Sequence, residues 1–298
     1  MRLRRDGAGG DALSFARWLE EVGDGVAGRD EFGLPDGEGR RRLRFLRDAC
    51  LGGDGQLDDL VAWTFEGLAR GETDVGDNII LTTTNVISED VNEKVATLFP
   101  GNESHHLLSS DVLDAEDADY NAVPEEELNR NLPQGMPPHA LKVKVGMPLI
   151  LLRNLDPSRG LCIGTRMRLK RVLGRFAIEV EVETEDGVRR VDVIPRIKMQ
   201  PKDDEYPYGW TRTQFPVRLA FAMTVNKSQG QTIRGRVGLY LPDPVFSHGQ
   251  LYVASSRTTD RRNLRLCIPA GEHRAHGSAP SEPNAGKVTV NVVYDEIL

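Results

Sequence analysis

Hydrophobic residues recur at helical spacing through much of the first 75 residues. The run DALSFARWLEEV places most of its apolar side chains on one helical face, and the pattern stops at Gly23. Two further amphipathic runs, RRLRFLRDAC and LDDLVAWTFEGLA, follow after Gly-rich acidic linkers. The pattern therefore predicts a helical segment over residues 1–75.

A parallel α/β unit is predicted next. The apolar run NIILTTT, at residues 78–84, is rich in β-branched residues and fits a buried strand. We expect Ser88 to cap a helix, SEDVNEKVATLF, that ends before Pro100. A strand followed directly by a helix is the repeating unit of parallel sheets. Residues 111–135 are acidic and turn-rich, and we interpret them as a surface insertion.

The hydrophobic period changes to two between Ala140 and Met199. The runs LKVKVGMPLILL, GTRMRLKRVL, RFAIEVEVETEDG and VRRVDVIPRI predict four or five short antiparallel strands. A tight turn is expected at residues 185–187. Strands of this number and length favour a small β-barrel.

Buried strand patterns return in the last third of the chain. RLAFAMTV, RVGLYL and LRLCI are predicted strands, HGQLYVASSRTT a helix, and KVTVNVVYDEIL a closing strand. Residues 270–287 are rich in Gly, Ser and Pro, and we expect them to be mobile. The sequence thus predicts an α/β fold in which a small barrel interrupts a parallel sheet.

The composition is typical of a soluble globular chain. Of its 298 residues, 39% are hydrophobic and 28% are charged. No apolar run approaches the roughly 20 residues needed to cross a bilayer, so we expect no membrane partner. The three cysteines lie far apart, which argues against disulfides and metal sites and favours a reducing compartment.

Charge is unevenly distributed along the chain. Residues 1–140 hold 29 acidic and 13 basic side chains, a net charge of −16, whereas residues 141–298 hold 16 acidic and 25 basic, a net charge of +9. A basic half permits contact with nucleic-acid phosphates, because lysine and arginine release counterions when they bind. Solvated surface would explain the same excess.

The loop TVNKSQGQT, at residues 224–232, carries the most suggestive chemistry. It follows a buried strand, and ligands of open α/β sheets bind at that edge. Lys227 offers a cation, Ser228 a hydroxyl and Gln229 an amide, while Gly230 allows close backbone approach. These groups suit phosphate and sugar contacts rather than base reading. An ordinary polar turn is an equal alternative.

Further along, the run QLYVASSR places Arg257 near the end of a predicted helix. An arginine in this position can reach a phosphate held by a neighbouring domain, as arginine fingers do. Arginines at helix C-termini more often interact with the helix dipole or with an acidic partner.

Together these segments resemble the Pif-type DNA helicases of superfamily one, especially the branch found in Helitron transposons. QFPVRLAFAMTVNKSQGQT is similar to the family's motif V, and VFSHGQLYVASSR to its motif VI. GMPPHALKVKVGMPLILLRNLDPSRGLCIGTRMRL resembles the start of its SH3-like 2B insertion, and NIILTTTNVISEDVN the start of its second RecA-like domain. Met1-Arg2-Leu3 matches the end of its NMRL segment. The matches follow the order of the family.

The resemblance implies roles for individual residues. Arg257, with Arg2 as a second candidate, would face the γ-phosphate of ATP, and Gln229 and Gly230 would couple their loop to the nucleotide. The implied contacts to single-stranded DNA are Thr84, Asn85, Thr224, Lys227, Ser228, Gln229, Lys142, Lys144 and Arg153. For the three barrel residues among them, solvated surface is an equal alternative.

Three positions depart from the family's pattern. Asn226 stands where many relatives have His, Ser255 where Leu is usual, and Ile163 where Asn is usual. Ser255 would weaken the packing of its helix, and Ile163 puts the geometry of its turn in doubt.

The first half of the family's ATP site has no counterpart in this sequence. The chain contains no G-x-x-x-x-G-K-[ST] segment, whose amides and lysine cradle the phosphates and whose hydroxyl holds Mg²⁺. VNVVYDEIL ends in Asp-Glu, but we interpret it as the closing strand. We therefore expect ATP and Mg²⁺ to bind only in a complete enzyme, and this chain alone to be inactive.

The resemblance predicts the C-terminal portion of an ATP-dependent 5′–3′ DNA helicase of the nucleus, acting in DNA repair, recombination and telomere maintenance. The partners would be single-stranded DNA and an N-terminal RecA-like domain, and we expect a monomer. The predicted domains are a helical segment (1–75), the first part of RecA-like domain 2A (76–135), the SH3-like 2B insertion (136–209) and the remainder of domain 2A (210–298).

Two alternatives stay open. One is a non-catalytic remnant that binds single-stranded DNA. The other is an SH3-like protein-interaction module, which is weakened because Phe176 is the only aromatic residue of the predicted barrel.

Overall fold

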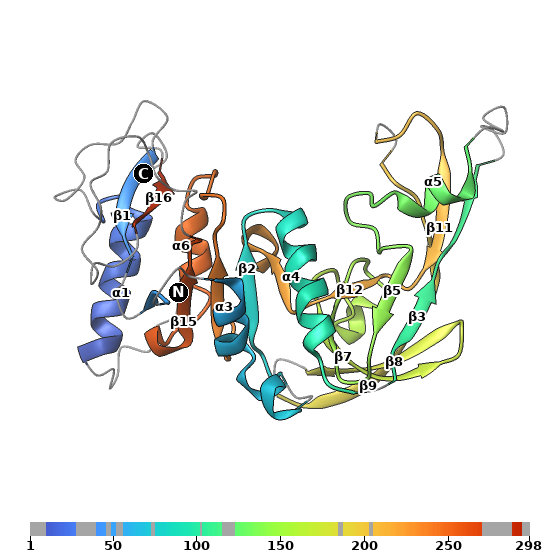
Figure 1. Cartoon of the computed structure of the whole chain (residues 1–298), viewed down its shortest axis with the longest axis horizontal. Coiled ribbons are helices and arrows are strands. Elements are labelled where there is room, and N and C mark those ends of the chain that lie inside the picture. Colours follow the sequence, from blue (N-terminus) through green and yellow to red (C-terminus); the bar gives the residue numbers. More distant parts are fainter. Residues whose placement is uncertain are drawn as a thin grey trace. The chain divides into compact units, whose positions relative to one another are not determined.

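The computed structural model divides the chain into two compact units (Figure 1). Unit 1 comprises residues 1–70, 75–95 and 221–298, and unit 2 comprises residues 71–74 and 96–220. Arg2 and the segment 270–287 lie outside the described residues, so the predictions for them stay untested. The structure describes residues 10–27, 40–45, 49–51, 56–72, 75–101, 103–114, 123–183, 187–202, 205–269 and 288–293.

Unit 1 is built on a parallel sheet with the strand order β13-β2-β14-β15. Every residue of β2 is buried, as expected for a parallel strand covered on both faces. Helix α3 (Leu57–Thr64) packs on β14 and β15. The strands predicted from NIILTTT, RVGLYL and LRLCI are thereby confirmed. Their bounds are Ile79–Thr82 (β2), Ala222–Thr224 (β13), Val237–Tyr240 (β14) and Leu264–Cys267 (β15).

The helices of unit 1 include α6, which lies beside α1 and the two-stranded sheet β1-β16 in Figure 1. The backbone N–H of Gly249 donates to the carbonyl of Val292 at 3.0 Å, so the closing strand is attached to the start of α6. The bounds are Gly10–Gly23 (α1), Leu57–Thr64 (α3), Asn85–Leu98 (α4), Gln250–Ser255 (α6), Arg40–Arg44 (β1) and Val288–Val292 (β16), with short 3-10 helices at Glu66–Arg70 (η2), Val225–Ser228 (η5) and Arg261–Asn263 (η6).

The helix predicted from RRLRFLRDAC is wrong. Its first residues form β1, which pairs antiparallel with β16 and places Leu43 opposite Thr289. Leu43 and Phe45 are both buried, and a spacing of two is the period of a strand. The pairing partner lies near the other end of the chain, so local periodicity could not reveal it.

The start of α4 also differs from the prediction. The helix begins at Asn85 rather than after Ser88. The Thr84 hydroxyl accepts a hydrogen bond from the backbone N–H of Ile87 at 3.4 Å, so Thr84 acts as the N-cap of α4. Ser88 is buried inside the helix, and its hydroxyl donates to the carbonyl of Asn85 at 3.0 Å.

Unit 2 consists mainly of antiparallel strands. Its largest sheet has the order β12-β6-β7-β8-β9, and two smaller sheets have the orders β10-β11-β4 and β3-β5. The antiparallel strands predicted between residues 140 and 199 are confirmed, and barrel closure stays a prediction. The bounds are His105–Leu108 (β3), Ser110–Leu113 (β4), Glu125–Arg130 (α5), Ala140–Val143 (β5), Pro148–Leu151 (β6), Pro157–Arg159 (η4), Arg166–Leu173 (β7), Ala177–Glu183 (β8), Arg189–Pro195 (β9), Ile197–Met199 (β10), Trp210–Gln214 (β11) and Val217–Leu219 (β12).

The run RLAFAMTV forms two strands instead of the single predicted strand. Its first part lies in β12, which pairs with β6 in unit 2, and its second part is β13 of the parallel sheet in unit 1. The residues between them are buried as well. A continuous apolar run therefore hid the passage of the chain from one unit to the other.

Residues 111–135 are more than the predicted surface insertion. Strand β4 pairs with β11, and Leu128 of α5 is buried in a cluster with Met136 and Trp210. These contacts place residues 96–135 in unit 2, whereas the sequence prediction assigns them to the RecA-like domain. Part of the acidic run, residues 115–122, lies outside the described residues.

A buried ion pair joins the sheet β10-β11-β4 to α5 and the segment that follows it. The Arg212 guanidinium donates to both carboxylate oxygens of Asp111, from Nε at 2.9 Å and from Nη2 at 2.6 Å. Both side chains are fully buried. The remaining Arg212 donors bind the carbonyls of Leu128, Asn131 and Pro137. The pair is therefore hydrogen-bonded on all sides, which makes its burial tolerable.

The fold class predicted from the sequence is confirmed: an α/β chain with a RecA-like parallel sheet and a separate small β domain. None of the helices in the described part of the chain is long and apolar enough to span a membrane.

Candidate nucleic-acid interface

Two loops emerge together at one edge of the parallel sheet. Strands β2 and β13 are parallel neighbours, with Ile80 opposite Ala222 and Thr82 opposite Thr224. Both strands therefore deliver the chain to the same carboxyl edge, where open α/β sheets bind their ligands. From β2 the chain enters α4, and from β13 it enters η5 and the turn that follows.

The two loops are joined by a hydrogen bond between Lys227 and Asn85. The Lys227 ammonium donates to Oδ1 of Asn85 at 2.8 Å. Asn85 is half-buried at the start of α4, while Lys227 is exposed. The structure thus brings together two residues that the sequence assigned separately to DNA contact.

A type II β-turn follows η5. Gln229 has φ −58° and ψ 133°, Gly230 has φ +81°, and the backbone N–H of Gln231 donates to the carbonyl of Ser228 at 3.0 Å. A type II turn requires positive φ at its third residue, which explains the glycine there. Among the described residues, the Gly230 amide has no acceptor. It is therefore a candidate donor to a phosphate oxygen at the tip of the turn.

Three of the predicted DNA contacts are used inside the fold. Ser228 is fully buried, and its hydroxyl donates to the carbonyl of Val225 at 2.7 Å. Thr224 is also buried, and the hydroxyl of Thr84 caps α4. Exposed side chains of the loop include Asn226, Lys227 and Gln229. These groups, together with the Gly230 backbone, are the surface that the loop offers to a ligand.

Arg257 lies just past Ser256, the residue that caps the end of α6, and its side chain reaches the same turn. Its Nη1 donates to the carbonyls of Ser228 at 3.1 Å and Gln231 at 2.8 Å. Its Nε donates to the carbonyl of Val253 at 2.7 Å, so the interaction with the helix C-terminus raised by the sequence is also present. Burial lowers the pKa of the Arg257 guanidinium, which nevertheless stays charged at neutral pH.

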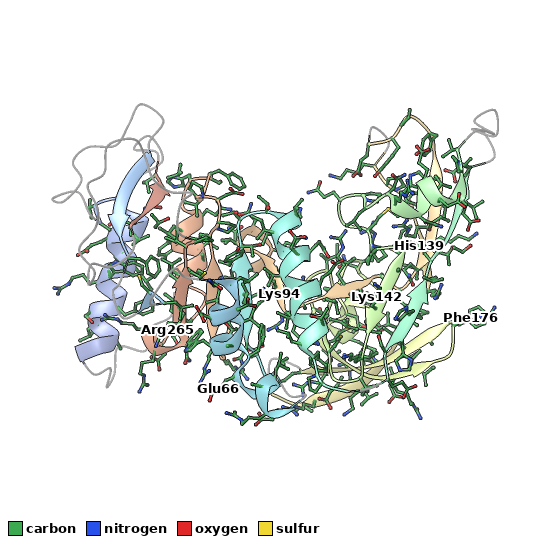
Figure 2. All side chains as sticks on the ribbon, viewed as in Figure 1. Glu66, Lys94, His139, Lys142, Phe176 and Arg265 are labelled. Carbon is green, nitrogen blue, oxygen red and sulfur yellow. The ribbon has the colours of Figure 1, made fainter. Side chains whose placement is uncertain are left out.

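The predicted contacts in unit 2 differ in their environment. Lys142 is exposed on β5 (Figure 2). The Lys144 ammonium donates to the carbonyl of Phe99 at 2.6 Å, and Nη1 of Arg153 donates to the carbonyl of Gly135 at 2.6 Å. Two of these three side chains therefore stabilise neighbouring segments of their own unit.

Comparison with known proteins shows which family this chain resembles. A family model described as the 2B domain of the DNA helicase Pif1 matches residues 126–171. The chain is 32% identical over 202 residues to the ATP-dependent DNA helicase PIF1 of Rattus norvegicus, covering 64% of this chain and 28% of the relative. It is also 48% identical over 54 residues to the ATP-dependent DNA helicase Pif1 of Campylobacter jejuni, covering 18% of this chain and 12% of the relative. The chain is similar to Pif-family DNA helicases over part of its length and theirs.

Solved structures of Pif helicases share the fold. The crystal structure of the Pif1 helicase from Candida albicans matches 86% of this chain and 53% of its own, with 21% identity and a TM-score of 0.53. The structure of Bacteroides Pif1 bound to single-stranded DNA matches 87% of this chain and 50% of its own, with 18% identity and a TM-score of 0.51. The chain spans about half the length of these solved relatives and less than a third of the curated ones it matches.

The departures from the Pif-family pattern have visible consequences. Asn226 accepts a hydrogen bond from Gln250 at 3.5 Å. The Ser255 side chain is buried on α6 with its hydroxyl unpaired among the described residues, which costs free energy; the expected weakening of that helix's packing stays a prediction. Ile163 is exposed, and Gly164 beside it adopts φ +90°. The turn thus forms with glycine supplying the unusual backbone conformation.

Sequence reasoning missed Gln250 and Asn92. Gln250, the first residue of α6, is buried and links this helix to Asn226 of the loop. Asn92 of α4 is buried and binds both the N–H and the carbonyl of Ala222, at 2.8 and 2.9 Å, thereby fixing the edge of β13. A polar residue at a buried helical position was the available signal in both cases. Within the described residues, no group of three or more His, Cys, Asp or Glu side chains is placed to hold a metal ion.

Proposed function

We propose that unit 1 forms the second RecA-like half of a Pif-type DNA helicase, gripping single-stranded DNA and contributing Arg257 to an ATP site shared with a first RecA-like domain. The observation that carries this proposal is the meeting of Lys227, Asn85 and the Gly230 turn at one sheet edge, with Arg257 attached to the same turn. A cation and a backbone amide that has no acceptor among the described residues, both offered by one loop, suit the DNA backbone. The Bacteroides relative was crystallised with single-stranded DNA bound.

The chain's own groups fit only part of an ATP site. Four of the five Arg257 N–H groups donate to protein acceptors. The fifth, on Nη2, has no acceptor within the described part of the chain and suits one phosphate oxygen. The phosphate cradle and the Mg²⁺ ligands would come from the first RecA-like domain, because the sequence has no P-loop. Bound ATP would supply the transferable phosphoryl group.

The finer expectations rest on the resemblance alone. They are 5′–3′ polarity, a nuclear location, a monomeric state and roles in repair, recombination and telomere maintenance. In the alternative of a non-catalytic DNA-binding module, the same loop would bind single-stranded DNA. The two differ in the role of Arg257: in a non-catalytic module, Arg257 would never contact a bound nucleotide.

Binding of a fluorescent oligothymidylate, followed by anisotropy over a range of salt concentrations, tests the proposal. We expect wild-type binding that weakens with salt, and Lys227→Ala should weaken it further and reduce the slope of log K against log salt by about 0.7. Lys94→Ala is the matched control, because Lys94 lies in unit 1 but pairs with Asp58 at 2.7 Å. The chain alone should not hydrolyse ATP. Absence of oligothymidylate binding at low salt would refute the proposed contact with single-stranded DNA.

A further inference from the structure

The Arg257 side chain bridges the two ends of the type II turn at residues 228–231. One nitrogen, Nη1, donates to the carbonyls of Ser228 and Gln231, the first and last residues of that turn. The turn's own closing bond, from Gln231 N–H to Ser228 carbonyl, measures 3.0 Å. The arginine therefore ties together the same two residues that define the turn.

The guanidinium is itself fixed to α6 and its end. Nε donates to the carbonyl of Val253 at 2.7 Å, and Nη2 donates to the hydroxyl of Ser256 at 2.9 Å. The backbone carbonyl of Arg257 also accepts from the N–H of Ile233, just past the turn, at 2.8 Å. Arg257 thus joins the end of α6 to the loop by both its side chain and its backbone.

Besides Arg257, the contacts that hold this loop include the Lys227–Asn85 bond, the 3.5 Å bond between Gln250 and Asn226, and the bond from the buried Ser228 hydroxyl to the carbonyl of Val225. Asn226, Lys227, Gln229 and Gly230 are exposed, and the bond from Gln229 N–H to the Asn226 carbonyl is long, at 3.4 Å. Exposed segments with few backbone hydrogen bonds open easily. Binding to a mobile loop is weakened by the entropy of ordering it.

We propose that Arg257 is a positioning residue for the DNA-facing turn and orders it before any nucleotide is present. The DNA part of this inference rests on the proposed function, whereas the ordering of the turn does not. A residue that acted only as an arginine finger would leave the nucleotide-free chain unchanged. As a positioning residue, Arg257 keeps Lys227 and the Gly230 amide in place for the DNA backbone.

The geometry also predicts that lysine cannot replace this arginine. The planar guanidinium reaches three carbonyls and one hydroxyl at once, whereas an ammonium is a compact point charge on a flexible stem. Arg257→Lys keeps the positive charge but loses the planar set of N–H donors of the guanidinium. It therefore separates positioning from simple electrostatic attraction of DNA.

The test uses the whole chain without nucleotide and has two readouts. Hydrogen exchange is measured at the amides of Gln231 and Ile233, with Leu239 of β14 as the reference for global folding. Affinity for oligothymidylate is measured by anisotropy. Arg262→Ala is the control, since this arginine is 88% exposed and pairs with Asp260.

Both Arg257→Ala and Arg257→Lys should accelerate exchange at the turn, leave exchange at Leu239 unchanged and weaken DNA binding by about tenfold. Arg262→Ala should stay within about twofold of wild type. Unchanged exchange at the turn in Arg257→Ala would overturn the proposal, and so would wild-type behaviour of Arg257→Lys. If the wild-type chain fails to bind DNA, the proposed function falls, and the exchange data still decide the role of Arg257.

Discussion

The Lys227 ammonium donates to Oδ1 of Asn85 at 2.8 Å, although Lys227 lies in η5 after β13 and Asn85 at the start of α4 after β2, the parallel neighbour of β13. The bond holds a long flexible cation above the edge of the sheet. Lysine side chains lose considerable entropy when they are ordered. A partner that orders Lys227 in advance therefore makes it a better phosphate ligand.

Asn85→Ala should consequently weaken binding of single-stranded DNA through Lys227. We expect the double variant with Lys227→Ala to bind only slightly more weakly than Lys227→Ala alone, because both changes affect one interaction. A double-mutant cycle measured by anisotropy should give a coupling free energy of about 0.5 kcal/mol or more. Strictly additive effects would show that the two residues act independently on DNA.

Gly230→Ala should damage the turn by backbone strain alone. A Cβ at this position would meet no atom within 4 Å, but φ is +81°, a region that costs other residues about 1–2 kcal/mol. Gly174→Ala is a matched control, with φ +73° and equally open space in unit 2. Both variants should lose similar unfolding free energy in urea, and Gly230→Ala alone should lose DNA affinity. Equal DNA affinities in the two variants would count against the turn as a binding element.

Asp111→Asn should be strongly destabilising. It would leave the Arg212 guanidinium buried without its carboxylate, and breaking such a pair typically costs about 3–5 kcal/mol. Arg171→Ala, which removes the pair between an exposed arginine and Glu179 in the same unit, should cost at most about 1 kcal/mol. Urea unfolding followed by tryptophan fluorescence, to which Trp210 of this unit contributes, measures the difference. Similar small losses in both variants would contradict the structural role of the buried pair.

Arg153→Ala should loosen the segment that Arg153 holds. The side chain donates to the carbonyl of Gly135, next to Met136, whose N–H closes a turn onto the carbonyl of Pro133 at 3.1 Å. We expect faster hydrogen exchange at the Met136 amide. Lys142→Ala, a change at an exposed position of the same unit, should leave that amide unchanged. Protection at Met136 that survives Arg153→Ala would show that the bond is dispensable.

The sequence predicted those parts of the fold whose signal is local. NIILTTT and RVGLYL are buried on both faces, so their apolar runs were sufficient to identify strands. The run at β1 could not be read correctly, because its strand partner β16 is distant in the sequence. The change of sheet within RLAFAMTV was hidden for a different reason: the run stays apolar and largely buried across it.

The sequence singled out the loop and the arginine, and their roles toward DNA and ATP stay predictions. Motif resemblance named Lys227, Gly230 and Arg257, and the structure shows Arg257 bonded to the turn that contains Gly230. It could not tell that Ser228 points into the fold, since a hydroxyl can bind either a ligand or a backbone carbonyl. Nor could it reveal that Arg257 binds the turn, because that contact depends on tertiary geometry.

Photo-crosslinking with an oligonucleotide that carries 4-thiothymidine, followed by mass-spectrometric mapping on the intact chain, tests the central claim most directly. The claim is that single-stranded DNA contacts the edge of the parallel sheet at the loop 226–231 and at Asn85. We predict crosslinks within these two segments that are lost in Lys227→Ala and retained in Lys94→Ala. Crosslinks confined to other segments, or unaffected by Lys227→Ala, would contradict it.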